Sequence, residues 1–510
     1  MDPHRSRELA TTVTRRASIR RPALALLSLL WVAAFAPTSR GLDLVLAGGR
    51  VIDPETGLDA VRNVGVTGDT ITQVSSERLE GTRTIDVRGL VVAPGFIDLH
   101  QHAQNPDGYR LMALDGVTAA LELELGVPDL QRFIDARRGA SPIHFGATAG
   151  HLAARVRAWD LPLPVSILGP EAGIIPQSGP VTNEPATAER LDRILASLRD
   201  QIEAGALGVG MGLEYSPGAT RHEVIEIFKL AASYGTPVFV HLRSAGRIEP
   251  GSSVESVSEV IGAAAISGAA LHIVHVNSGC LGDSPECLSM MAGARARGLD
   301  VTTEAYPYTA GMTLINSAHF NPGWRERRSL DYGDVELPAT GERLTRERFE
   351  ALHADPEPHT VLIHMNPDEV VDAVIADPSV IIASDGVKDH PRGAGTHARV
   401  LARYVREQRT ITLMDAIRRM SLMPAQRLEK ALPEAKRLGR LQQGAQADIV
   451  VFDPDSVRDR ATFRASTEAS AGVRYLVVAG TIVVDDGRIV EGAVPGRALV
   501  RNSALLKRDR

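Results

Sequence analysis

The chain has 510 residues, of which 44% are hydrophobic and 23% charged, and its net charge is −6. These values are typical of a soluble globular protein with a sizeable core, and the length allows one large domain or roughly two to three ordinary ones. The modest negative charge gives no reason to expect nucleic acid as a partner.

The first forty residues differ in composition from the rest of the chain. A basic stretch, TRRASIRR at 14–21, precedes the apolar run PALALLSLLWVAAFA at 22–36, which has small residues near its end at Ala34 and Ala36. This order is typical of a secretory signal, and the apolar run is shorter than the ~20 residues of a spanning helix. We therefore predict a signal peptide at 1–41 and an exported protein, periplasmic or secreted, without a stable membrane span after its removal. An uncleaved membrane anchor is the alternative.

Short β-rich runs broken by Gly, Asp and Pro occupy both ends of the remaining chain. They cover 42–92 and return at 440–495, where the sequence reads VRYLVVAGTIVVDDGRIV near its end. Such runs are typical of antiparallel strands joined by turns. We predict that the two parts meet in one small β-sandwich domain.

The middle of the chain, 93–439, alternates strands with helices. Apolar strands such as TPVFVHLR, ALHIVHVN and SVIIASD are separated by helical stretches such as RHEVIEIFKLAASYG. Repeated units of this kind predict an α/β fold, a parallel (β/α)8 TIM barrel, whose chemistry lies at the carboxyl ends of the strands.

Five side chains that can bind metals occupy those strand ends. His100 and His102 end the strand in PGFIDLHQH, and alternate residues of an extended segment point to one side. His241, His275 and Asp385 end three further strands. A single histidine in an apolar strand is more often a satisfied core residue, but the joint placement favours a metal site. Ligands of these types suit zinc, so we predict one or two divalent ions per chain.

Two further histidines lie in barrel strands or at their ends. His272 precedes His275 by three residues in the same strand, so we expect its side chain on the opposite face, outside the site. His151 follows Gly150 at a strand end, and we expect it to line the substrate pocket.

Cys280 and Cys287 are the chain's two cysteines. Outside the cytosol such a close pair can form a disulfide, and the alternative is a pair of free thiols in a loop. A zinc site of the CxxC type is excluded, because the spacing is too wide and there is no second pair.

Seven motifs in order carry a resemblance to a known family. They are PGFIDLHQH, GLEYSPGA, HLR, YPYTAG, SDG, PRGAGTHARVLARYVRE and GRLQQGAQADIVVFDP. Over most of 42–490 the chain resembles the amidohydrolase superfamily, in its N-acyl-D-amino-acid deacylase (D-aminoacylase) branch. The resemblance implies that His100 and His102 serve one metal, that His241 and His275 serve the other, and that Asp385 takes the proton from the attacking water.

A ligand that bridges the metals would lie in GVTAALELELGV at 116–127. D-aminoacylases have a cysteine there and other superfamily members a carbamylated lysine, but this stretch has neither. Glu122 and Glu124 share one face of the predicted strand, where a carboxylate is costly unless a metal or a charged partner satisfies it. We predict Glu124 as the bridging or metal-binding carboxylate, because it lies nearer the strand end. Glu122 is the alternative, and either glutamate could instead pair with an arginine.

The substrate-binding positions follow the family only in part. In D-aminoacylases a lysine, a tyrosine, a serine and an arginine hold the substrate carboxylate. Here Tyr306 and Arg392 match, whereas Asn277 and Met312 replace the lysine and the serine. Arg392 could hold a carboxylate with two hydrogen bonds or could be a solvated loop arginine. By resemblance, an inserted subdomain at about 313–375 covers the site.

The expected reaction is hydrolysis of a linear amide. The resemblance implies that an N-acyl-D-amino acid is cleaved to a carboxylate and a D-amino acid, with Asp385 acting as general base and then as general acid. The partner would be a small molecule, an N-acyl amino acid or a dipeptide-like compound. The alternatives are an exported dipeptidase, a cyclic-amide hydrolase of the same superfamily, and a barrel that binds ligands without catalysis.

Overall fold

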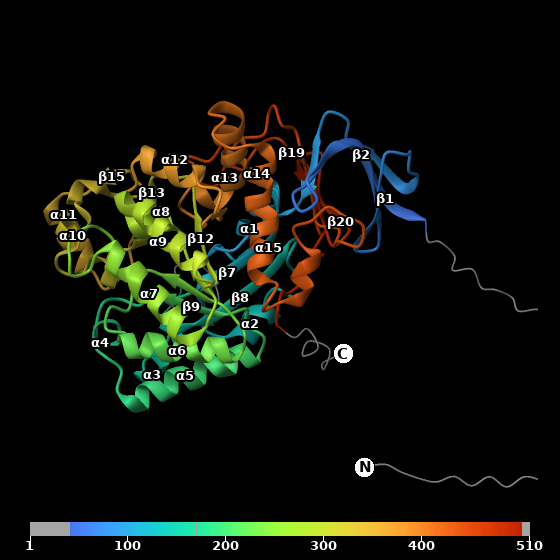
Figure 1. Cartoon of the computed structure of the whole chain (residues 1–510). Coiled ribbons are helices and arrows are strands. Elements are labelled where there is room, and N and C mark those ends of the chain that lie inside the picture. Colours follow the sequence, from blue (N-terminus) through green and yellow to red (C-terminus); the bar gives the residue numbers. More distant parts are fainter. Residues whose placement is uncertain (1–40, 165, 167, 169–171, 502–510) are drawn as a thin grey trace, which may run out of the picture. The chain divides into compact units, whose positions relative to one another are not determined.

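The computed structural model describes residues 41–501 apart from 165, 167 and 169–171 (Figure 1). The predicted signal peptide therefore lies outside the described residues, except for its last position. Within the described part of the chain, no helix combines the length and the apolar character needed to cross a bilayer.

Eight parallel strands form the barrel that the alternating pattern predicts. Their hydrogen-bonded order is β17-β12-β11-β10-β9-β8-β7-β6. Residues just beyond the two edge strands close the ring, because the Gly386 amide donates to the His100 carbonyl at 3.2 Å and the His102 amide donates to the Gly386 carbonyl at 2.9 Å. The bounds are β6 (Phe96–Asp98), β7 (Val117–Val127), β8 (His144–Gly150), β9 (Val209–Gly212), β10 (Val238–His241), β11 (Leu271–Ile273), β12 (Val301–Ala305) and β17 (Val380–Ile382).

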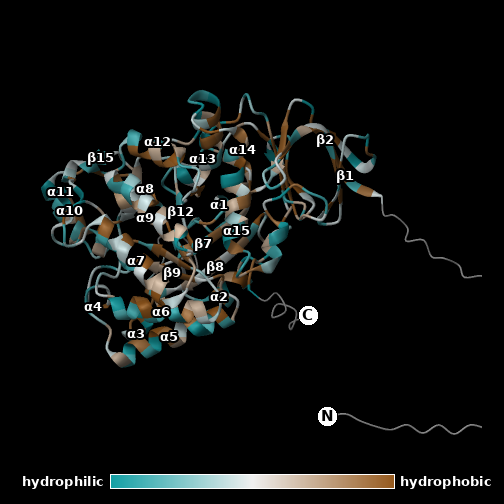
Figure 2. Ribbon diagram, in the orientation of Figure 1, coloured by the Kyte–Doolittle hydropathy of each residue, from teal (hydrophilic) through white to brown (hydrophobic). Residues whose placement is uncertain are grey.

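Helices cover the outside of the barrel, and Figure 1 shows α3, α5 and α6 along one side of the central strands. Helix α5 illustrates the pattern, since Ile194, Leu198 and Ile202 recur every four residues and are buried. Figure 2 accordingly shows both hydrophilic and hydrophobic residues along it. The helices are α1 (Pro106–Leu114), α2 (Leu130–Asp135), α3 (His151–Ala158), α4 (Pro180–Asn183), α5 (Ala188–Glu203), α6 (Arg221–Ser233), α7 (Ser253–Ser267), α8 (Val276–Cys280), α9 (Ser284–Ala296), α12 (Asp368–Ala376), α13 (Arg392–Arg399), α14 (Leu413–Ile417) and α15 (Met423–Leu428).

Both ends of the described chain contribute to one nine-stranded sheet, as the prediction of a small terminal β domain requires. The two parts join where β5 pairs with β18 in antiparallel register, from Val91 opposite Phe452 to Pro94 opposite Ile449. In Figure 1 the early blue strands and the late red strands accordingly lie together. The strands are β1 (Leu42–Asp53), β2 (Leu58–Thr67), β3 (Thr70–Ser75), β4 (Gly81–Asp86), β5 (Val91–Pro94), β18 (Ile449–Phe452), β19 (Val473–Val478), β20 (Thr481–Asp485) and β21 (Arg488–Ile489).

A third sheet is inserted between β12 and β17, in the part of the chain where the resemblance implies an added subdomain. Its order is β13-β16-β14-β15, and two short helices pack with it around a small aromatic core. In that core the rings of Trp324 and Phe349 stack with centroids 5.3 Å apart. The elements are β13 (Ala310–Leu314), α10 (Trp324–Arg328), β14 (Val335–Leu337), β15 (Glu342–Arg343), α11 (Arg346–His353) and β16 (Thr360–His364).

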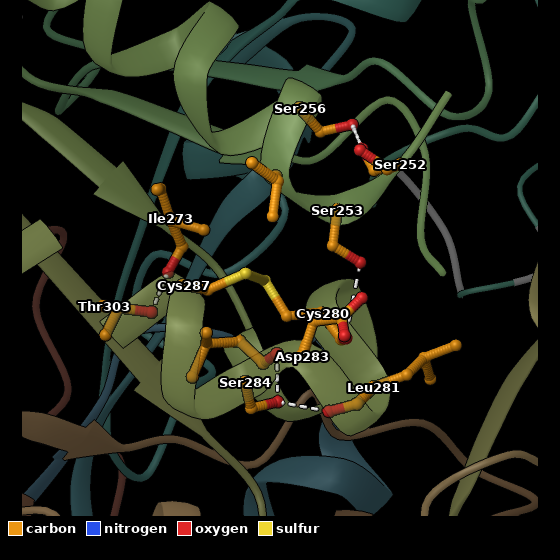
Figure 3. Close-up of a disulfide and its surroundings, with 12 residues drawn as sticks. Ser252, Ser253, Ser256, Ile273, Cys280, Leu281, Asp283, Ser284, Cys287 and Thr303 are labelled. Atoms are coloured by element: carbon orange, nitrogen blue, oxygen red, sulfur yellow. Dashed lines mark hydrogen bonds between the residues drawn. A yellow bond between two sulfur atoms is a disulfide. The ribbon is translucent and has the colours of Figure 1, made fainter. Parts of the chain in front are cut away.

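The two cysteines form a disulfide between α8 and α9 (Figure 3). Both side chains are fully buried, and the bond closes a loop whose ends are seven residues apart in the sequence. The Ser253 hydroxyl, on α7, donates to the Cys280 carbonyl at 3.3 Å. The alternative of two free thiols is therefore wrong, and the disulfide fixes the turn that follows β11.

We expect the paired replacements Cys280→Ala and Cys287→Ala to lower the free energy of unfolding by about 2 kcal/mol, because a cross-link over a short loop restricts the unfolded chain. Denaturant unfolding of the oxidised protein and of the variant measures the difference. A reductant should lower the wild-type midpoint towards that of the variant and leave the variant unchanged, since the chain has no other cysteine. Two titratable thiols in the unfolded, unreduced protein would contradict the expectation.

Candidate metal centre

The carboxylate of Glu124 lies at the centre of the four histidines that the sequence places at strand ends. Its Oε2 is 3.1 Å from Nε2 of His100 and 3.1 Å from Nε2 of His102. Its Oε1 is 2.6 Å from Nδ1 of His241 and 2.9 Å from Nε2 of His275. One carboxylate therefore joins two pairs of imidazoles that come from three different strand ends.

Asp385 completes the cluster from the end of β17. Its Oδ1 lies 3.3 Å from Nε2 of His100 and 3.3 Å from Nε2 of His102. The six side chains thus fall into two groups that share Glu124, and the ligand atoms within each group lie within 4.8 Å of one another. The groups are His100, His102, Glu124 and Asp385, and Glu124, His241 and His275. Nitrogen and oxygen donors in this arrangement fit one or two zinc ions.

The structure gives the two glutamates of β7 different places. Glu124 faces the cluster, whereas Glu122 lies behind it, with Oε2 2.7 Å from Nδ1 of His102. Glu304, at the end of β12, does the same for His100, with Oε1 2.6 Å from its Nδ1. These outer carboxylates turn the Nε2 atoms of both imidazoles inwards, as the partners of metal-binding histidines do. Glu304 is a site residue that the sequence analysis missed.

Among the described residues, His272 belongs to neither group of ligand candidates, as expected, but the expectation that its side chain points to the opposite face was wrong. Its Nε2 lies 3.1 Å from Oε2 of Glu304, the carboxylate that also contacts His100, so its side chain lies behind the cluster rather than on the opposite face. The alternation rule failed here because β11 ends at Ile273, before His275. His275 has left the strand, with a φ of +27°, so a three-residue spacing no longer puts the two side chains on opposite faces.

Opposite charges set the protonation of the cluster in the metal-free chain. Burial alone would raise the pKa of the Glu124 carboxyl, but the neighbouring His100, His102 and His241 hold that pKa well below its usual range. Burial would lower the pKa of His100, but Asp385, Glu124 and Glu304 together raise it well above the ordinary histidine value. The carboxylates are thus ionised, which is the state that binds a cation.

Arg392 and Tyr306 lie beside Asp385. The Arg392 Nη2 atom is 2.9 Å from Oδ2 of Asp385, and its guanidinium lies 4.7 Å from the centre of the Tyr306 ring. Arg392 is 1% exposed, so the alternative of a solvated loop arginine is wrong. Burial would raise the pKa of the Asp385 carboxyl, but Arg392 and His100 hold that pKa below its usual range.

Comparison with known proteins places this chain in a family. The sequence pattern of the Amidohydrolase family matches residues 83–484, which is more than half of the chain. The chain belongs to the amidohydrolase family. It is 31% identical to an N-acyl-D-glutamate deacylase of Alcaligenes xylosoxydans xylosoxydans, over 91% of this chain and 98% of the relative. A D-aminoacylase of the same organism is 28% identical, over 91% of this chain and 99% of the relative.

Solved structures agree with the fold of this amidohydrolase. The crystal structure of an N-acyl-D-glutamate deacylase from Bordetella bronchiseptica, complexed with zinc and a phosphonate inhibitor, superposes with a TM-score of 0.73 at 26% identity. The match covers 90% of this chain and 100% of that one. A D-aminoacylase crystal structure gives a TM-score of 0.74 at 26% identity, with the same coverage of both chains.

A cavity opens onto the centre of this amidohydrolase and is lined by barrel and inserted residues together. Tyr306, Arg392 and Met312 line it, as the family resemblance implies for three of the four substrate positions. Asn277, at the fourth position, is fully buried and donates to the Tyr306 carbonyl at 3.2 Å. The inserted sheet and its helices contribute further residues, Thr313, His319, Arg328 and Ile363.

His151 does not take part in this cavity, so the expectation for it was wrong. His151 is the first residue of helix α3. The described residues that line the cavity do not include it. Its Nε2 lies 2.7 Å from Oε1 of Glu223 on α6, which also accepts from Arg155. His151 therefore belongs to a buried charge cluster between two outer helices.

Glu214 lines the cavity and belongs to the motif GLEYSPGA, but it was not among the predicted site residues. It follows β9, and its Oε2 lies 2.8 Å from Nε2 of His241 and 3.0 Å from Nδ1 of His319. Its Oε1 contacts the guanidinium of Arg328. An acidic residue directly after a barrel strand was the available signal, because it lies on the same rim as the histidines.

Proposed function

We propose that this chain is an N-acyl-D-amino-acid deacylase, which hydrolyses a linear amide to a carboxylate and a free D-amino acid. The observation that carries the proposal is the Glu124 carboxylate between two pairs of imidazoles, with the Asp385–Arg392 pair at its side. The relatives named as deacylases of N-acylated D-amino acids support the choice of substrate.

The ligands in this proposal are His100, His102, Glu124 and Asp385 for one ion, and Glu124, His241 and His275 for the other. Zinc bound here would supply a Lewis acid that polarises the scissile carbonyl and acidifies the attacking water. Glu122 and Glu304 hold the imidazoles of His102 and His100 in place from behind.

Asp385 carries the protons in this reaction. Its carboxylate, kept ionised by Arg392, accepts the proton that the water loses as it attacks the carbonyl carbon. The protonated Asp385 then donates that proton to the amide nitrogen as the carbon–nitrogen bond breaks. This second transfer matters because an amine is a poor leaving group until it is protonated.

Arg392 and Tyr306 hold the substrate carboxylate. The Nε and Nη1 atoms of Arg392 and the hydroxyl of Tyr306 are buried and have no hydrogen-bond partner among the described residues. Buried polar atoms without partners are costly, and a carboxylate placed between these donors would satisfy them. The two side chains share one wall of the cavity, so they can act on the same group.

Export to the periplasm or the medium is part of the proposal. It is supported by the basic and apolar order of residues 14–36 and by the buried disulfide, which suits an oxidising compartment. Amino-terminal sequencing of the protein from the periplasmic fraction tests it, and a mature chain that still begins at Met1 would contradict it.

The deacylase proposal is tested on the mature protein purified with zinc. Bound zinc is counted per chain, and hydrolysis of paired D and L N-acetyl amino acids, dipeptides and hydantoins is followed on the same sample. We expect turnover of the D-acyl substrates, its loss on chelation and its return with zinc. Cleavage of dipeptides or cyclic amides alone would overturn the substrate assignment, and absence of both zinc and turnover would overturn the hydrolase assignment.

A further inference from the structure

One wall of the cavity is formed by a buried ion pair between the barrel and the inserted subdomain. Glu214, after β9, contacts Arg328 at the end of α10 and His319 from the short 3-10 helix at Ala318–Phe320. The side chains of all three residues are at most 9% exposed. The Arg328 charge thus has its counterion inside the protein.

The charges that line the cavity can be assigned one by one. Glu124 and Asp385 belong to the metal centre, and Glu214 balances Arg328. Burial lowers the pKa of Arg328 to about 10, which leaves its guanidinium charged at neutral pH and in need of that carboxylate. Of the two arginines that line the described part of the cavity, Arg392 has buried donor atoms, Nε and Nη1, without partners, whereas the guanidinium of Arg328 contacts Glu214. The cavity accordingly offers free cationic donors for one substrate carboxylate.

The rest of the lining is largely apolar. Leu125, Ile175, Met312, Ile363 and Met365 line the same cavity. A second carboxylate on the substrate would lie against these side chains or near Glu214, where like charges repel. An uncharged, apolar substrate side chain avoids both the burial of a charge among apolar residues and the repulsion by Glu214.

We propose that Glu214 sets the substrate preference of this enzyme by neutralising Arg328, so that the cavity takes N-acyl amino acids with uncharged, apolar side chains and rejects acidic ones. This inference rests on the proposed deacylase function and names the side chain of its substrate. Glu214 acts as a specificity-determining residue, because its charge decides whether Arg328 is available to a ligand.

The test compares kcat/KM for N-acetyl-D-leucine and N-acetyl-D-glutamate with the zinc-loaded full chain. We expect the wild type to prefer the leucine derivative by at least about 100-fold. In Glu214→Gln, the freed Arg328 should move this ratio towards the glutamate derivative by at least about tenfold. Adding Arg328→Met to Glu214→Gln should abolish the shift, since the cation is then gone.

A matched control is available in Glu223→Gln. Glu223 is also a buried glutamate that contacts an arginine, Arg155, and it contacts one histidine, His151, where Glu214 contacts two. Glu223 lies outside the cavity lining. Glu223→Gln should leave the substrate ratio unchanged. A fall in kcat common to both substrates in Glu214→Gln reports the lost contact to His241, whereas the ratio reports the charge.

Calorimetric binding of the same two ligands separates the possible failures. If the wild type binds the leucine derivative more tightly and Glu214→Gln reverses the trend, but neither ligand is hydrolysed, the deacylase function fails and the charge assignment stands. A wild-type preference for the glutamate derivative overturns the inference. So does binding of neither ligand, or a Glu214→Gln shift no larger than that of Glu223→Gln.

Discussion

Replacing Asp385 with asparagine should lower kcat for an N-acyl-D-amino acid by about 10³-fold or more, because the chain loses the group that makes both proton transfers. Asparagine has nearly the same shape and can still accept a hydrogen bond from Arg392. The group of Glu124, His241 and His275 is untouched, so we expect at least one zinc per chain to remain. Single-turnover kinetics and zinc content, measured on the same preparation, check both statements.

The leaving group distinguishes proton transfer from a purely structural role of Asp385. An ester analogue releases an alkoxide or phenoxide that depends less on protonation than an amine does, so Asp385→Asn should harm the ester less than the amide. Equal losses for the two substrates would mean that Asp385 only holds the metal. If Asp385→Asn bound no zinc at all, its loss of activity would likewise be explained by the lost metal and not by proton transfer.

The sequence alone was sufficient to predict which residues of an extended segment point to the same side. The alternation of extended residues correctly placed His100 and His102 on one side, and both imidazoles face Glu124. The same rule failed at His272, because no local signal marks the end of β11 at Ile273. Parity thus continued past the end of β6 at Asp98, which precedes His100 and His102, but not past the end of β11. Beyond a strand end it depends on whether the chain stays extended.

Residues whose partners are distant in the chain could not be predicted in this way. Glu304 becomes part of the site only through its contact with His100, which lies 204 positions earlier. Glu214 and Arg328 meet because the inserted subdomain returns over the barrel, and the motif GLEYSPGA that contains Glu214 does not indicate this partner. The pairing of β5 with β18 likewise follows from the folded chain, although the β-rich character of both ends was visible.

Replacing Glu124 with glutamine should remove most activity and at least one metal per chain. The neutral amide leaves four imidazoles and the bound cations without the negative charge that lies between them. We expect kcat/KM to fall by about 10³-fold or more, with zinc content reduced in the same samples. Glutamine preserves the size of the side chain, so a loss of packing does not explain the result.

Glu122→Gln is the matched comparison, since the same substitution two residues away changes a carboxylate that contacts the outer nitrogen, Nδ1, of His102. Partners of metal-binding histidines contribute about 10- to 100-fold to affinity or activity, so Glu122→Gln should be the milder variant. Zinc titrations of both variants decide between the two glutamates. A larger loss of zinc affinity in Glu122→Gln would assign the bridging role to Glu122. Small and equal losses in both variants would mean that no carboxylate shared by the two metals is needed for activity. We expect the loss in Glu124→Gln to be much larger than the loss in Glu122→Gln. Both glutamates are buried and stand on the same strand, so the difference comes from the direction of their side chains.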